Sequence, residues 1–202
     1  MSSIKLTADS GGGTFEIKAP SSGSNTRVLT IPDIADGTLL TSASATGKIL
    51  QVVQTVKTDT FTSSSTSYTD VTGMSVSITP SSSSNKVLVL VNFNCSVSAN
   101  DRWSIYQLVR GSTPIFIGDT ASSRSVGSVG LVNVAGSGSG NAVHNQNIAF
   151  LDSPSTTSAT TYKIQGKVQS GATFKINLSD NDGDASYGLR TASSITVKEV
   201  AA

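Results

Sequence analysis

The chain has 202 residues, of which 36 are Ser and 24 are Thr, and its 14 Lys and Arg residues nearly balance its 13 Asp and Glu residues to leave a net charge of +1. This balance excludes a basic nucleic-acid-binding protein, because no positive field would attract phosphates, and with 37% hydrophobic residues it also excludes a disordered charged tail. Cys95 is the single cysteine, which excludes a disulfide framework, and the apolar runs are too short for a membrane span.

The first 47 residues carry few apolar side chains between strong turn signals such as Gly11–Gly13 and Asp36-Gly37. A segment of this kind cannot bury enough surface to fold alone, so we expect an extended β arm that is stabilised by copies of itself. Its candidate interface and anchoring residues are Phe15, Ile17, Val28, Leu29, Ile31, Leu39 and Leu40. The predicted domains are this arm, residues 1–47, and a larger domain, residues 48–202.

The larger domain places apolar residues at every second position between clusters of Ser, Thr, Gly and Asn, which is typical of strands. No window of a dozen residues repeats apolar positions at the helical period. Strands are predicted at 49–56, 74–78, 86–97, 103–109, 114–118, 130–134, 148–151, 162–168, 174–178 and 195–197. Short strands at spacings of roughly ten residues favour an all-β fold, a β-sandwich with a jelly-roll-like arrangement.

The strand predicted at 86–97 has two different faces. One face is apolar throughout and consists of Val87, Val89, Val91, Phe93, Cys95 and Val97. Cys95 is therefore interpreted as a small core residue rather than as a reactive thiol. The opposite face begins with Leu88 and Leu90 and ends with Asn92, Asn94 and Ser96. We expect the first half to be central in a sheet or to lie against a subunit interface, and the second half to have one face in water.

The densest polar cluster is Asp180-Asn181-Asp182-Gly183-Asp184, which places carboxylates at alternate positions as at the start of a calcium-binding loop. An EF-hand would continue with Gly at the sixth position and Glu at the twelfth, where this chain has Ala185 and Thr191. A tight Asp-Gly turn between two strands is the favoured interpretation. A weak cation site at Asp180, Asp182 and Asp184 is the alternative, and no cofactor is expected.

The sequence pattern contains no catalytic motif. His144 is the single histidine and lies in a polar stretch, and no Gly-x-Ser-x-Gly pattern surrounds a serine, so an exposed loop histidine is expected. Glu16 and Glu199 are the two glutamates, and neither suggests the paired carboxylates of a glycosidase. The remaining candidates, Asp101, Asp119 and Asp152, are expected to shape turns at strand ends. We therefore expect no enzymatic activity.

Two aromatic residues are of interest because Trp103 and Tyr106 are three positions apart, which places them on opposite faces of a strand. One of them is expected in the core, and the other would line an interface or a sugar-binding surface. For Trp103 the favoured interpretation is the core or a subunit contact.

The stretch GGGTFEIKAP (11–20), followed by TRVLTIP (26–32) and DGTLLT (36–41), resembles N-terminal segments of fibre and appendage proteins of tailed bacteriophages, especially marine and cyanobacterial ones. The rest of the chain resembles the C-terminal domain of these proteins. The matching stretches are residues 47–53, 69–73, 77–80, 85–89, 108–114, 150–154 and 161–163. These motifs are structural rather than catalytic.

The resemblance implies a virion surface protein, usually a parallel homotrimer with intertwined arms and a C-terminal β-sandwich knob. Closed threefold symmetry would hide sheet edges that otherwise aggregate. Long tail fibres add an adaptor domain and a shaft, whereas only residues 1–47 precede the knob here. The favoured hypothesis is therefore a capsid decoration (cement) protein or head fibre, anchored by its arm with the knob outward. The alternative is a short tail-fibre receptor-binding protein that recognises a host-surface glycan.

The partners expected from this resemblance are further copies of the chain and the major capsid protein or a tail component. Neither nucleic acid nor membrane insertion is expected. The first residues lack a basic region followed by an apolar run, so no secretory signal is expected, and the protein would be made in the host cytoplasm and end on the virion surface.

Overall fold

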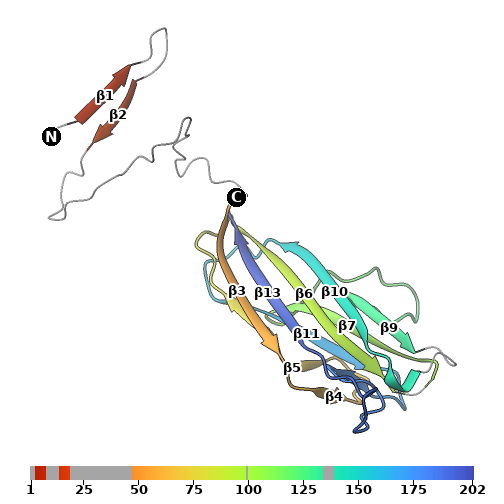
Figure 1. Ribbon diagram of the computed structural model, residues 1–202. Helices are drawn as coiled ribbons and strands as arrows, with labels where there is room; N and C mark the ends of the chain where they lie inside the picture. Colours follow the sequence, from red (N-terminus) through yellow and green to blue (C-terminus); the bar gives the residue numbers. More distant parts are fainter. Residues whose placement is uncertain (1–2, 8–13, 19–46, 99, 134–138) are drawn as a thin grey trace. The chain divides into compact units, whose positions relative to one another are not determined.

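The computed structural model describes residues 3–7, 14–18, 47–98, 100–133 and 139–202, and the chain divides into two compact units, Met1–Leu39 and Leu40–Ala202 (Figure 1). In the first unit, β1 (Ser3–Thr7) pairs antiparallel with β2 (Thr14–Lys18), with Leu6 opposite Phe15 and Ile4 opposite Ile17. The other predicted arm residues, Val28, Leu29, Ile31, Leu39 and Leu40, lie outside the described residues.

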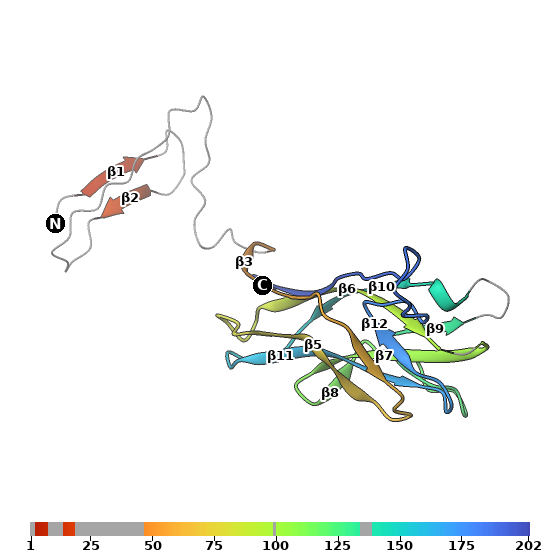
Figure 2. The same ribbon diagram turned by 60° about the horizontal axis from the view of Figure 1, so that its bottom comes forward.

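The larger unit is a sandwich of two antiparallel sheets (Figure 2), which confirms the predicted all-β class. Its strands are β3 (Ile49–Lys57), β4 (Phe61–Ser63), β5 (Thr69–Ile78), β6 (Lys86–Val97), β7 (Arg102–Arg110), β8 (Thr113–Ile115), β9 (Val129–Asn133), β10 (His144–Asp152), β11 (Thr160–Val168), β12 (Phe174–Ile176) and β13 (Ser193–Val200). A 3₁₀ turn, Ser139–Asn141, precedes β10.

The strand pairs are nested inside one another. β7 pairs with β9, β6 with β10, β5 with β11 and β3 with β13, in each case antiparallel. One sheet has the order β3-β13-β6-β10, with β12 beside the second half of β6 and β4 beside β12. The other has the order β5-β11-β7-β9, with β8 also beside β7. A long hairpin folded over on itself produces this order, so the sandwich is an eight-stranded jelly roll with three short additional strands.

The core lies between the two sheets. The predicted apolar face of β6 is buried from Val87 to Val97. Apolar residues of β12 and β13 extend it within the same sheet, and apolar residues of β5, β7 and β11 cover it from the opposite sheet. Aromatic rings fill one region: Tyr106 lies 4.9 Å from Phe93 and 5.5 Å from Phe174 between ring centroids, with edge-to-face geometry. Cys95 belongs to this core, and burial raises the pKa of its thiol to about 12, so the structure confirms an unreactive core cysteine.

Several strand boundaries differ from the sequence prediction. β10 begins at His144 rather than at residue 148, because the polar residues 144–147 pair with β6 although they carry no apolar alternation. β8 ends at Ile115, so Phe116, which has a left-handed backbone (φ 53°), follows the strand instead of lying in it. No strand is predicted at residues 61–63, which form β4. Ser96 was expected on a face in water, but it is buried, and its hydroxyl donates to the carbonyl of Leu178.

An ion pair joins the two sheets at one end of the sandwich. Asp152, at the end of β10, is 5% exposed and accepts hydrogen bonds from Arg110 of β7 at 2.8 and 2.9 Å. Tyr162 of β11 donates its hydroxyl to the same carboxylate at 2.7 Å. Burial, followed by the hydrogen bond to Asp152, raises the pKa of Tyr162, so this hydroxyl keeps its proton and donates it. Asp152 was expected to shape a turn and instead connects β10 to the opposite sheet.

Glu199 of β13 is a second buried carboxylate, 2% exposed. It accepts hydrogen bonds from the backbone nitrogen of Ser81 at 2.6 Å, from the Ser81 hydroxyl at 2.7 Å and from the Asn85 amide at 2.6 Å. Burial raises the pKa of Glu199, but these hydrogen bonds outweigh it and hold the pKa below its usual value. The charged carboxylate therefore fixes the Ser-rich loop between β5 and β6.

Candidate interaction surfaces

The outer face of the β3-β13-β6-β10 sheet has an apolar end and a polar end. Strand register places one row of side chains across it: Val52 of β3 opposite Lys198 of β13, then Leu88 of β6, then Leu151 of β10. Val52 is 56% exposed and Leu151 is 46% exposed, while Leu88 is half-buried. The aliphatic stem of Lys198 covers part of the surface between Val52 and Leu88.

We define the apolar face as Ile49, Leu50, Val52, Leu88, Leu90 and Leu151. Ile49 and Leu50, at the start of β3, are 43% and 44% exposed. A patch of this kind is unusual on a monomeric soluble protein and marks an interaction site. β6 lies between β13 and β10, so the expected central place of its first half is confirmed, and a subunit interface there stays a prediction.

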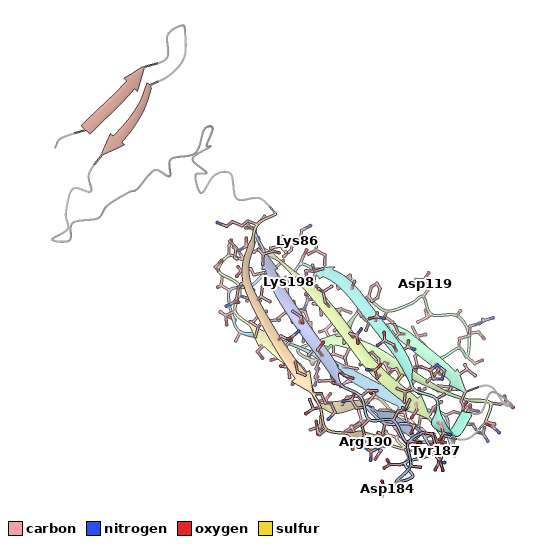
Figure 3. The ribbon with its side chains drawn as sticks, viewed as in Figure 1. Lys86, Asp119, Asp184, Tyr187, Arg190 and Lys198 are labelled. Atoms are coloured by element: carbon pink, nitrogen blue, oxygen red, sulfur yellow. The ribbon has the colours of Figure 1, made fainter. Side chains whose placement is uncertain are left out.

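The apolar face lies at the end of the jelly roll where the N-terminal segment enters. Gly47 donates its backbone N–H to the carbonyl of Ala201, and Ala201 donates to Lys48, both at 2.9 Å. Figure 3 shows Lys86 and Lys198 at this end, whereas Asp184, Tyr187 and Arg190 lie at the opposite end. The chain therefore enters the jelly roll beside the exposed hydrophobic residues of β3.

The polar end of the same face carries a ladder of asparagines from β6 and β10. Asn92 donates to Asn147 at 2.8 Å, Asn145 donates to Asn92 at 3.0 Å and to Asn94 at 3.1 Å, and Asn147 donates to Asn145 at 2.6 Å. The side-chain amides therefore form hydrogen bonds with one another along an exposed row. The ladder explains why β10 continues to His144, which is exposed as predicted but lies in a strand rather than in a loop.

A groove lies on the outer face of the other sheet. It has a volume of about 510 Å³ and is lined by Trp103, Ser104, Ile105, Ser123, Arg124, Ser125, Gly130, Leu131 and Val132. Trp103 and Tyr106 do lie on opposite faces of β7, as predicted, and Tyr106 is the core residue. Trp103 is half-buried on the outer face, which contradicts the core half of the favoured interpretation, while a subunit contact of Trp103 stays a prediction.

The loop between β8 and β9 forms one wall of this groove, and several hydrogen bonds hold it against the sheet. Tyr68 donates its hydroxyl to the carbonyl of Val126, Gly118 donates to Gly127 at 3.2 Å, and Ser128 donates to Tyr106 at 2.7 Å. Gly127 fits only because it lacks a side chain: a Cβ there would lie 2.7 Å from the carbonyl oxygen of Tyr106. These contacts position Arg124 beside Trp103 in the groove.

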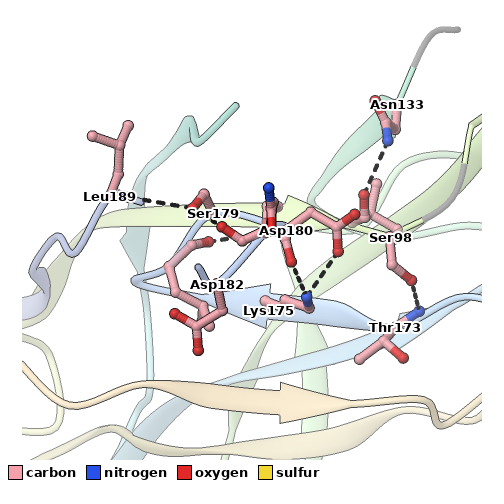
Figure 4. A network of polar contacts seen from close by, with 12 residues as sticks. Ser98, Asn133, Thr173, Lys175, Ser179, Asp180, Asp182 and Leu189 are labelled. Atoms are coloured by element: carbon pink, nitrogen blue, oxygen red, sulfur yellow. Dashed lines mark hydrogen bonds and ion pairs between the residues drawn. The ribbon is translucent and has the colours of Figure 1, made fainter. Parts of the chain in front are cut away.

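The Asp-rich loop 180–184 uses two of its carboxylates for ion pairs. Asp180 accepts from Lys175 at 2.8 Å, and Lys175 also donates to the Asp180 carbonyl (Figure 4). Asp182 pairs with Arg190, and this hydrogen bond lowers the pKa of Asp182. Asp184 is exposed. With Lys175 and Arg190 bound to two of the three carboxylates, the arrangement favours a structural loop over the alternative cation site.

Nothing in the part of the chain that the structure describes resembles a metal centre or a membrane span. Among these residues, no three His, Cys, Asp or Glu side chains gather in a way that could hold a metal ion. Within the same described ranges, no helix is long and apolar enough to cross a membrane.

No protein-family model matches the chain, and no curated protein matches it. Solved structures with some similarity include the infectious bursal disease virus Gx strain, the VP2 subviral particle of infectious bursal disease virus and the T=1 particles derived from that virus. Each of the three is 13% identical in sequence to this chain, and their TM-scores are 0.39, 0.39 and 0.40. Each match covers 85% of this chain and 42%, 42% and 41% of the respective viral chain. This chain thus spans about two fifths of those proteins. The jelly-roll assignment rests on its own strand order.

Proposed function

We propose that this chain is a structural protein of a bacteriophage virion, a homotrimer on the particle surface with an anchoring N-terminal arm and a jelly-roll knob that faces outward. The observation that carries the proposal is the apolar face, which lies beside the point where the arm joins the knob. The sequence resemblance to phage fibre and appendage proteins points the same way, and jelly rolls are frequent in viral capsid and lectin domains. The proposal assigns the protein no catalytic residue and no cofactor.

The apolar face suits contact between copies because it combines exposed aliphatic side chains with an edge strand. Val52 lies on β3, which pairs with β13 on one side, and Leu151 lies on β10, which pairs with β6. A stable contact buries about 800 Å² per partner. Burial of these side chains around a threefold axis would bring three entering chains together, which is the arrangement that intertwined arms require.

Light scattering after size-exclusion chromatography is expected to give a mass of about 62 kDa, three chains of 20.6 kDa each. The substitution Val52→Lys places a charge in the proposed interface and is expected to shift the mass toward 20.6 kDa as the protein is diluted. Val132→Lys is the matched control, because Val132 is equally exposed, at 56%, but lies on β9 of the other sheet. A monomer at all concentrations would contradict the homotrimer. Equal dissociation of the two variants would contradict the assignment of the interface to this face.

The position of the protein on the virion distinguishes the favoured role, a capsid decoration protein or head fibre, from the alternative, a short tail fibre. A capsid decoration protein or head fibre would contact the major capsid protein, whereas a short tail fibre would contact a tail component and bind a host-surface glycan. Gold-labelled antibodies against the knob are expected to decorate the heads of intact virions in electron micrographs. Labels confined to tails would reject the decoration role and support the receptor-binding alternative.

A further inference from the structure

We propose that the groove beside Trp103 is a binding site for an acidic saccharide, a sugar unit that carries a carboxylate or a sulfate. This site lies on the outer face of the sheet opposite to the apolar face, so it does not depend on the homotrimer. Its volume of about 510 Å³ falls in the range of small-ligand sites, which is about 300–1,000 Å³.

The floor of the groove provides the apolar half of such a site. Trp103 pairs with Val132 across β7 and β9, and Ile105 pairs with Gly130, so these four residues line a continuous strip. Gly130 leaves open the space that a side chain would fill. A sugar ring has a face of C–H groups that stacks on an aromatic ring, and the half-exposed indole of Trp103 offers that ring next to solvent.

The walls of the groove provide hydrogen-bonding groups of the size that sugars use. These groups are the hydroxyls of Ser123 and Ser125, which come from the loop between β8 and β9. Short hydroxyl groups beside an apolar floor suit a ligand that presents hydroxyls along its edge. An extended peptide would instead need the exposed backbone of an edge strand or a deep pocket for a side chain.

The charge of the groove selects an acidic ligand. Arg124 is the one charged lining residue, and a guanidinium binds a carboxylate or a sulfate through paired hydrogen bonds. Lys167 of β11 adds a second cation near the floor, with its ammonium 5.9 Å from the centre of the Trp103 ring and 4.9 Å from that of Tyr68. Asp119, the carboxylate of the same loop, is exposed (Figure 3). It is not among the residues that line the groove.

The groove contains its own reporter, because Trp103 is the single tryptophan of the chain. Intrinsic fluorescence of the full-length protein can be followed during titration with trigalacturonate, with a sulfated heparin-derived tetrasaccharide, with neutral maltotriose and with acetate. We expect a saturable change in emission with at least one of the two acidic saccharides. Maltotriose is expected to bind at least tenfold more weakly, and acetate is expected to leave the emission unchanged.

Two variants test the assignment to this groove. Arg124→Gln removes the charge at an exposed position and is expected to weaken acidic-saccharide binding at least tenfold. Gly130→Val fills the groove: its Cβ would lie 3.5 Å from the carbonyl oxygen of Ser104 and 3.7 Å from Ile105, which are ordinary contacts, so the fold is expected to persist while binding is lost. Lys198→Gln removes a cation from the other sheet and serves as the matched control with unchanged binding.

The outcomes that overturn the proposal are distinct from those that would reject the homotrimer. If neither acidic saccharide produces a saturable change in tryptophan emission, the groove is not a binding site for such ligands. Equal fluorescence responses to maltotriose and trigalacturonate would show that the groove does not prefer acidic saccharides. A response to acetate as large as that to the acidic saccharides would show adventitious anion binding only. Retained binding in both Arg124→Gln and Gly130→Val would place the ligand elsewhere. Light scattering on the same samples reports the oligomeric state separately.

Discussion

Replacement of Asp152 by alanine is expected to lower the free energy of unfolding by about 3–5 kcal/mol, the cost of removing one member of a buried ion pair. The carboxylate accepts two hydrogen bonds from Arg110 and one from Tyr162. Without it, a buried phenol loses its acceptor and a guanidinium that is only 30% exposed loses its counter-ion. Urea unfolding at neutral pH, followed by circular dichroism, measures the difference directly.

Asp70→Ala is the matched control for this experiment. Asp70 accepts hydrogen bonds from Lys163 at 2.8 Å and from Gln165 at 2.7 Å, but its side chain is 56% exposed. An exposed pair of this type contributes about 0–1 kcal/mol. A loss of less than about 1 kcal/mol for Asp152→Ala, similar to the control, would show that the two sheets hold together without this ion pair.

The second large effect is expected in the aromatic part of the core, where Phe174→Ala should cost about 3–5 kcal/mol. Phe174 is fully buried and packs edge-to-face on Tyr106. Gly166 of β11 lies directly beneath the ring, and a Cβ on it would lie 2.8 Å from Phe174 Cζ and 3.0 Å from Tyr106 Cδ1. Gly166→Ala alone is therefore expected to cost about 1–3 kcal/mol through overpacking.

A double-mutant cycle makes this prediction sharper than either single substitution. Once the Phe174 ring is absent, the methyl group of Gly166→Ala enters the cavity, so its cost should fall well below the value in the unsubstituted protein. Additive losses would show that the glycine is required for a reason other than contact with this ring. Phe116→Ala serves as the control, because Phe116 is 45% exposed and its loss is expected to cost about 1 kcal/mol or less.

The sequence predicts the core strands well because apolar and polar residues alternate along them, and the apolar positions are the buried ones. Val87 to Val97 alternate without interruption, and the structure buries that face of β6. The first half of β10 lacks this signal: its Asn145 and Asn147 side chains form hydrogen bonds with asparagines of β6, a pairing that only the fold creates. β4 is missed for the same reason, since a three-residue strand with Thr62 and Ser63 has one apolar residue.

The apolar face and the groove beside Trp103 differ in how much of each can be predicted from the sequence. Leu88 and Leu90 indicate a second apolar face on this strand, which fits either a covered central strand or an apolar outer face. The groove requires Trp103, Arg124 and Val132 to converge, and they come from β7, from a loop and from β9. Period-two alternation shows that Trp103 and Tyr106 face opposite ways, but not which of them faces the core. The Asp152 ion pair is likewise hidden, because its partners lie on two other strands.

The nested pairing of strands sets the order in which the jelly roll can form during synthesis. Tyr106 pairs with Val129, which follows it closely in the sequence with only β8 between their strands, whereas Lys57 pairs with Ser193 near the end of the jelly roll. Closing short loops costs less entropy, so β7 and β9 can pair early, while β3 lacks its partner until residues 193–200 leave the ribosome. The strand that carries Val52 is thus the last to be fixed, and the contact between copies that we propose through it would form only after β13 has been synthesised.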